Sequence, residues 1–160
     1  MAEISGQQAL EERILTRYLD EIARDSDWVI TDADLQLELD ALITTIDQSS
    51  DRENTPRLIE TIRRRRGLGP TRFNALLRRN TILRRLLPPT ENAEFQGLIT
   101  AEVGLATAML PENPTHDRLT EIIRRSTLVV QQREMEKLAR SLLEGREVLV
   151  MDRSLKWSGE

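Results

Sequence analysis

The chain has few of the residue types on which many protein functions depend. It contains no cysteine, which excludes disulfides and thiolate metal sites. Its single histidine, His116, cannot by itself form a histidine-rich metal site or a conventional catalytic triad. Aromatic residues make up only 3% of the sequence, which weakens any interpretation that stacks nucleic-acid bases on rings. Lysine is limited to Lys137 and Lys156, so the abundance of arginine partly reflects composition and is weak evidence of function.

Common catalytic and nucleotide-binding motifs are also missing. The segment GLGP at 67–70 lacks the lysine or serine of a phosphate-binding loop, and neither HExxH nor GxSxG occurs. Asp32 and Asp34 are explained more simply as first-turn residues of a helix than as a catalytic pair. We therefore expect no catalytic residues, no metal site, no cofactor and no enzymatic activity.

No apolar segment is long enough to cross a membrane. The most apolar window, residues 97–110, carries Glu102 and falls short of the roughly 20 residues that a spanning helix needs. Residues 1–19 show no basic leader followed by an apolar run, so they do not resemble a signal peptide. We expect no membrane span, and a chain that is either cytoplasmic or a mature segment of an exported protein.

Charge is distributed unevenly along the chain. Residues 56–90 contain ten arginines and one acid, a net charge of +9. Residues 1–55 carry −10 and residues 91–160 carry −3, so the overall net charge is only −4. Such polarity is typical of a nucleic-acid-binding face, of a partner-binding face, or of one part of a fold that neutralises another.

Apolar periodicity and capping residues predict a mainly helical, all-α fold in a single domain of residues 1–160. Five or six helices are expected, over residues 8–25, 32–47, 56–66, 70–87, 91–104 and 115–144. The expected N-caps are Thr31, Thr55, Thr90 and Thr115, and the expected stops are Gly67, Pro88–Pro89 and Gly145.

The segment EVLVMD at 147–152 alternates in polarity and predicts one short β-strand near the C-terminus. A lone strand needs a partner, and the only nearby candidate is AEISG at 2–6. Their pairing would bring the two termini together.

The basic stretch admits several interpretations. The run Arg63–Arg66 is a solvated helix end, a rim for a binding partner, or a set of phosphate contacts. The helices on either side of GLG also resemble a helix-turn-helix superficially. The acidic overall charge and the proline in the turn argue against that motif, and an amphipathic core helix explains the pattern equally well. In a helix-turn-helix, the helix over residues 70–87 would present Arg72, Asn74, Arg78, Arg79 and Arg85 to the DNA.

Taken together, the elements resemble the N-terminal chaperone domain of SurA and related parvulin-type foldases. In that family one helix precedes a helix that starts with a V-T-D pattern, and a glycine-led helix with hydrophobic and arginine repeats follows. A long C-terminal helix and a strand then complete the domain. The matching residues are Ile30, Thr31, Asp32, Asp34, Leu35, Glu38, Gly67, Leu68, Phe73, Leu77, Arg78, Leu83, Arg84, Val148, Val150, Asp152 and Leu155.

The resemblance covers residues 8–88 and 115–157 and implies a helical domain that binds non-native or partner polypeptide in an apolar groove. The isomerase module that lies between these halves in the family is missing, because the connection at 89–114 is too short to hold it. Prolyl isomerase activity is therefore not implied. The family's location would place the chain in an extracytoplasmic compartment.

The resemblance also suggests where a polypeptide binds. We expect six apolar residues around the groove and four arginines as its basic rim, with ordinary core packing as the alternative for each apolar residue. The groove residues are Phe73, Leu76, Leu77, Leu83, Phe95 and Leu98, and the rim residues are Arg63, Arg64, Arg65 and Arg66. Two other functions stay open: a helical nucleic-acid-binding module using the Arg63–Arg85 face, and a structural adaptor or homodimer with the long C-terminal helix as interface.

Overall fold

The structure, a computed structural model, describes residues 2–46 and 55–157, and within these ranges it contains six α-helices and no β-strand. The expected all-α fold with a long C-terminal helix is thus confirmed. The helices are α1 (Ala2–Asp25), α2 (Asp32–Ile46), α3 (Thr55–Arg65), α4 (Pro70–Leu86), α5 (Ala93–Ala108) and α6 (His116–Trp157).

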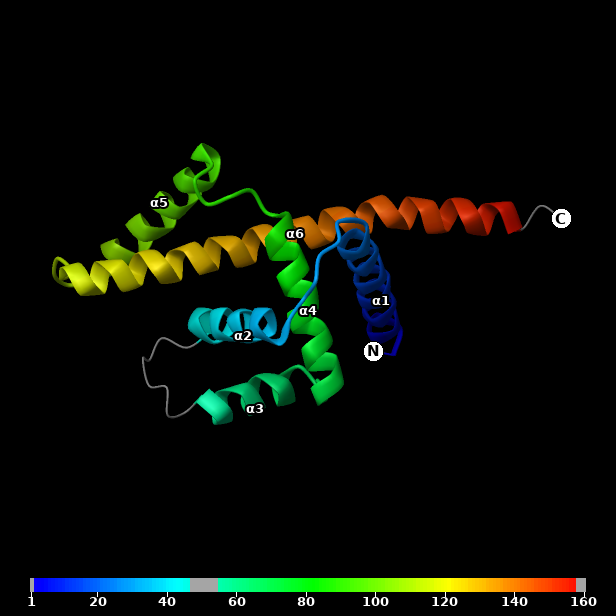
Figure 1. The fold of residues 1–160 in the computed structure, drawn as a ribbon, viewed down its shortest axis with the longest axis horizontal. Helices are drawn as coiled ribbons and strands as arrows, with labels where there is room; N and C mark the ends of the chain where they lie inside the picture. Colours follow the sequence, from blue (N-terminus) through cyan, green and yellow to red (C-terminus); the bar gives the residue numbers. More distant parts are fainter. Residues whose placement is uncertain (1, 47–54, 158–160) are drawn as a thin grey trace.

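The long helix α6 forms the spine of the molecule (Figure 1). It has 42 residues, so its length is about 63 Å at 1.5 Å per residue. The connection between α4 and α5 lets α5 fold back along one side of α6, and α1, α2 and α3 lie on the other side (Figure 1). α4 crosses α6 and also contacts α1 and α2, which makes it the central helix of that side.

Three clusters of buried apolar side chains hold the helices together. The first joins α1, α4 and α6, the second joins α2, α3 and α4, and the third joins α5 to α6. Since α4 and α6 each take part in two clusters, they connect the whole core. The buried members are, in that order, Leu15, Leu19, Ala23, Ile82, Leu83 and Met135; Leu42, Ile62, Phe73 and Leu77; and Phe95, Ile99 and Val130.

α1 and α3 end in the same backbone motif. After α3, Gly67 adopts a positive φ of 62°, and the N–H groups of Gly67 and Leu68 donate back to carbonyls of the last turn. After α1, Asp27 takes this left-handed position with φ 53°, and the N–H of Trp28 donates to the carbonyl of Ala23. Glycine was expected to end α3, and that prediction is confirmed. Aspartate tolerates the same conformation better than most residues do.

The predicted β-strand was wrong, because residues 147–152 lie in α6. The candidate partner at residues 2–6 is helical too, and its residues open α1. A lone strand would leave its backbone N–H and C=O groups without partners, whereas a helix satisfies them within its own turns. The apolar residues Val148, Met151 and Leu155 also fit helical spacing, which the short alternation obscured.

Three other expected boundaries also differ from the structure. Asn92 rather than Thr90 caps α5, because its side-chain oxygen accepts hydrogen bonds from two backbone N–H groups of the first turn. α5 continues past Gly104, and α6 continues past Gly145. A glycine inside a helix costs only about 1 kcal/mol relative to alanine, so it does not by itself end one.

A buried ion pair joins three helices where α4 crosses α6. The Arg84 guanidinium of α4 donates two hydrogen bonds to the carboxylate of Glu38 on α2, at 2.8 and 2.9 Å. A third hydrogen bond from Arg84 reaches the side-chain oxygen of Gln131 on α6. The Glu38 side chain is only 4% exposed, so this charge depends on its partner for compensation.

We expect Glu38→Gln to lower the free energy of unfolding by about 2–4 kcal/mol. Removing one partner of a buried pair costs about 3–5 kcal/mol, and Arg84 keeps some solvent contact that reduces this loss. Urea denaturation followed by circular dichroism measures the change. Glu60→Gln is the matched control, since Glu60 pairs with arginines at the surface of α3 and should cost no more than about 1 kcal/mol. Equal losses in the two variants would show that the buried pair has no special role.

Candidate functional site

The six apolar residues expected around one groove are distributed over the whole core. Phe73 and Leu77 belong to the second cluster, Leu83 to the first and Phe95 to the third, and all four are buried. The remaining two, Leu76 and Leu98, are more accessible and lie on different helices. The structure therefore does not bring these six residues together in one groove.

The four arginines at 63–66 have different surroundings in the structure. Arg63 and Arg64 pair with Glu60 one turn earlier on α3, at 3.4 and 3.0 Å. Arg65 is exposed, and Arg66 faces the space between α1 and α4. Of the four expected rim residues, Arg66 thus borders the groove between α1 and α4.

The arginines of α4 mainly neutralise the acidic N-terminal helices. Arg78 pairs with Asp20 of α1 at 3.0 Å, and Arg84 pairs with Glu38 of α2 as described above. Part of the charge polarity of the sequence is therefore compensated within the molecule, which was one of the three interpretations left open.

The helix expected to read nucleic acid is not a free helix. α4 contacts α1, α2 and α6, and its buried residues form the middle of the core. Of the five side chains that it would present, Arg78 and Arg85 are engaged in ion pairs and Arg79 is half-buried. Arg72 and Asn74 are exposed. This geometry disfavours insertion of α4 into a DNA groove.

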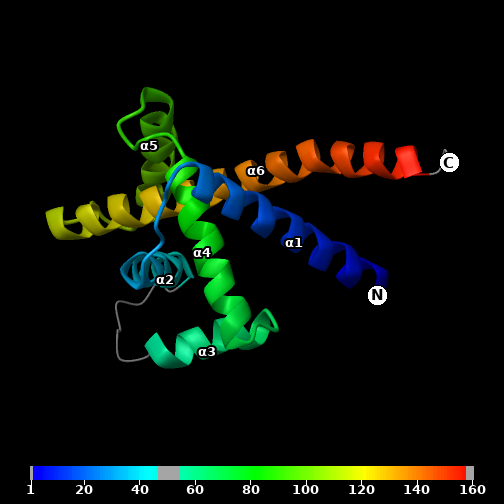
Figure 2. The same ribbon diagram turned by 45° about the vertical axis from the view of Figure 1, so that its right-hand side comes forward.

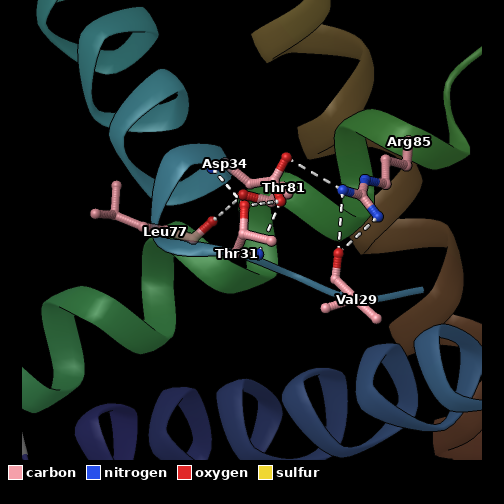
Figure 3. Close-up of polar contacts among 6 residues, drawn as sticks. All are labelled: Val29, Thr31, Asp34, Leu77, Thr81 and Arg85. Carbon is pink, nitrogen blue, oxygen red and sulfur yellow. Dashed lines mark hydrogen bonds and ion pairs between the residues drawn. The ribbon is translucent and has the colours of Figure 1, made fainter.

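The start of α2 is fixed by a capping box that α4 completes (Figure 3). The backbone N–H and the hydroxyl of Thr31 donate to the Asp34 carboxylate at 2.8 and 2.7 Å, and the N–H of Asp34 donates to the Thr31 hydroxyl oxygen. The Arg85 guanidinium pairs with Asp34 at 3.2 Å and donates to the carbonyl of Val29. It also lies 5.8 Å from the centre of the Trp28 ring. The Thr31 cap predicted from the sequence is confirmed.

The same contacts change the acidity of Asp34. The backbone N–H of Thr31 lowers the pKa of the Asp34 carboxyl most, and the Thr31 hydroxyl and the Arg85 guanidinium lower it further. A lowered folded-state pKa means that these contacts stabilise the fold above the ordinary pKa of 3.8 and are lost as the pH falls through the lowered value.

A groove of about 800 Å³ lies between α1 and α4, and Arg66 borders it. Figure 2 shows the two helices close together near the C-terminal end of α1 and diverging toward its N-terminal end. One wall is a single face of α1, whose lining residues recur every three or four positions from Ala9 to Arg24. The other wall consists of Arg66, Leu68, Arg72, Ala75, Leu76 and Arg79.

The groove combines apolar surface with charge. Leu68, Ala75 and Leu76 supply apolar side chains on the α4 wall. Arg79 is the least exposed of its arginines, and burial lowers the pKa of this guanidinium, an effect that nearby Arg66 increases and Glu12 opposes. Since arginine stays protonated at neutral pH, Arg79 still places a positive charge in the groove wall.

Apolar spacing predicted the helix over residues 8–25 but not this groove. A signal was present, since α1 carries charged residues at the same three-to-four spacing as its apolar ones. Sequence periodicity shows that a helix has two faces, but it does not show that the polar face lies opposite a second helix.

A second hollow of about 340 Å³ lies where α2, α4 and α6 meet. Asp34, Glu38, Arg84 and Arg85 line it, and all four are already engaged in the contacts described above. Across the parts of the chain that the structure describes, no three His, Asp or Glu side chains are grouped to hold a metal ion. In the same ranges, no helix has the length and apolar character needed to span a membrane.

Comparisons of this chain with protein-family models, with curated proteins and with solved structures give no match. The resemblance to SurA-type domains stays a prediction from the sequence motifs.

We expect Asp34→Asn to destabilise the fold at neutral pH and to have progressively less effect at acid pH. The substitution removes a charge that the folded state stabilises only while Asp34 is ionised, so the difference from the unmodified protein should shrink as the pH falls below 3.8. Urea denaturation at a series of pH values measures it. Asp32→Asn removes a charge from the same helical turn without breaking the Thr31 contacts and should cost less. A difference for Asp34→Asn that is independent of pH would contradict this assignment.

Proposed function

We propose that this chain is a non-catalytic, chaperone-like domain that binds polypeptide, and that the bound segment occupies the groove between α1 and α4. The observation that carries the proposal is the groove itself, an open space of about 800 Å³ with apolar side chains between charged walls. This size lies within the usual range of ligand clefts, about 300–1,000 Å³.

The shape of the groove suits a helical or extended segment. Its α1 wall runs from Ala9 to Arg24, which is about 22 Å or four turns of helix. Amphipathic helices that bind in grooves place apolar anchors at helical spacing against such a surface. Leu68 and Leu76 would contact these anchors, and Leu76 is one of the six groove residues predicted from the sequence.

The arrangement of helices also supports a relation to SurA-type domains. α6 packs against α1, α2 and α4, so the C-terminal part of the chain returns to complete the N-terminal helical part. Residues 89–114, where the family carries its isomerase module, contain α5 and its connections instead. We therefore propose polypeptide binding without prolyl isomerase activity.

Blocking the groove should weaken binding. We expect Ala75→Trp to reduce suppression of the aggregation of a denatured model protein by about threefold or more, because the indole occupies space on the α4 wall. Light scattering of the aggregating protein, with a prolyl isomerase assay beside it, measures both activities. Ala33→Trp, at an exposed site of α2 outside the groove, is the control and should act like the unmodified chain. No suppression by the unmodified chain would overturn the proposal, as would equal suppression by both variants.

A second candidate function is self-association through α5. The sequence also predicted a homodimer, but with the long C-terminal helix rather than α5 as its interface. Leu98, Leu105 and Met109 are 39%, 65% and 87% exposed and follow one edge of α5. Their spacing of seven and four residues keeps them on the same side of the helix. Glu102 is the only charged residue between Gly97 and Met109, and it pairs with Arg133 of α6. An uncharged face can meet its own copy across a two-fold axis without bringing like charges together.

If α5 forms this interface, the chain should be a dimer by light scattering, and Leu105→Glu should weaken the dimer by about tenfold or more. The matched control is Leu37→Glu, because Leu37 has nearly the same exposure, 69%, on α2. A monomeric unmodified chain, or equal effects of the two variants, would exclude the α5 interface.

A further inference from the structure

The walls of the α1–α4 groove carry more positive than negative charge. Six arginines line it, three from α1 and three from the α4 side, against three acids that all lie on α1. The acids are Glu12, Asp20 and Glu21, and the arginines are Arg13, Arg17, Arg24, Arg66, Arg72 and Arg79.

Two of the three acids are already engaged by arginines. Asp20 pairs with Arg78, which lies outside the groove lining, and Glu21 pairs with Arg17 at 3.6 Å. The acids therefore compensate only part of the positive charge of the groove.

Four groove arginines have no ion pair with any carboxylate that the structure describes. They come from both walls and are all exposed, so their guanidinium groups are accessible to a molecule in the groove. They are Arg13 and Arg24 on α1, and Arg66 and Arg72 on the other wall.

Arg79 is half-buried in the same wall. Its buried Nε has no hydrogen-bond partner in the parts of the chain that are described.

We propose that the groove selects acidic amphipathic segments of polypeptide. The apolar side of such a segment lies on Leu68 and Leu76, and its carboxylates lie against the unpaired arginines of the two walls. This inference rests on the proposed function, and it adds the chemical class of the partner. It follows from charge complementarity: an anionic segment compensates the arginines that the fold leaves unpaired.

The observations favour a protein rather than a nucleic acid as this anionic partner. No aromatic side chain lines the groove to stack against bases. Leu68 and Leu76 need apolar contacts, which a phosphate backbone does not supply.

The test compares three labelled peptides of about 16 residues, the length of the α1 wall. All three carry leucine at helical spacing, and their remaining positions are mainly glutamate, glutamine or lysine. Fluorescence anisotropy with the full chain gives the Kd of each peptide at low and at high salt. A labelled DNA duplex is measured beside them. We expect the glutamate peptide to bind most tightly and to lose this advantage at high salt.

Arg66→Glu/Arg72→Glu should weaken binding of the glutamate peptide by about tenfold or more at low salt, because two attractions become repulsions. The matched control is Arg118→Glu/Arg140→Glu, which reverses two exposed α6 arginines outside the groove. It should leave the Kd unchanged. Circular dichroism of both variants verifies that they are folded.

The outcomes separate the inference from the function on which it rests. Equal binding of all three peptides, unaffected by Arg66→Glu/Arg72→Glu, would overturn the preference for acidic segments and leave polypeptide binding intact. No binding of any peptide would overturn both. Tighter binding of the duplex than of the glutamate peptide, lost in the Arg66→Glu/Arg72→Glu variant, would overturn both in favour of nucleic acid.

Discussion

The ion pair between Glu38 and Arg84 is the interaction on which the arrangement of the helices depends. Its carboxylate comes from α2 and its guanidinium from α4, and Gln131 extends the contact to α6. A buried carboxylate is costly without its partner and hydrogen bonds, so the pair favours the relative position of these three helices in which all of the contacts form. Apolar packing alone specifies position less sharply, because aliphatic side chains accommodate small shifts. The contacts among Glu38, Arg84 and Gln131 therefore fix where α4 crosses α6, and the other helices pack around this crossing.

Arginine has two roles on α4, and the difference between them explains why the charge pattern was ambiguous. Arg78, Arg84 and Arg85 point at acids of α1 and α2 and serve the fold. Arg72 has no such partner among the described carboxylates and faces a groove. A count of charges along the sequence gives both kinds of arginine equal weight. Only the three-dimensional arrangement shows which charges are compensated internally and which remain for a partner.

Local signals in the sequence predicted much of the helical structure. The cap at Thr31, the glycine stop at Gly67 and the proline start of α4 rest on backbone chemistry within a few residues, and the structure confirms them. The strand predicted at 147–152 was wrong because six residues are too few to distinguish the two-residue period of a strand from the 3.6-residue period of a helix. The structure distributes the apolar residues expected around one groove over several clusters for another reason. Apolar spacing on α4 marks what is buried, and Phe73 and Leu77 are buried in the core rather than held open for a ligand. The groove itself depends on how two distant helices meet, which no local pattern encodes.

The attachment of α1 has a consequence for the groove that it borders. Its buried residues, Leu15, Leu19 and Ala23, lie in its C-terminal half, whereas Leu10 is 55% exposed. α1 is thus attached along its C-terminal half, and the part of the helix that precedes Leu15 extends beyond this attachment. A small rotation of the attached half displaces the N-terminal end of α1 more than it displaces the attached residues. The width of the groove is therefore set by how Leu15, Leu19 and Ala23 pack against α4 and α6.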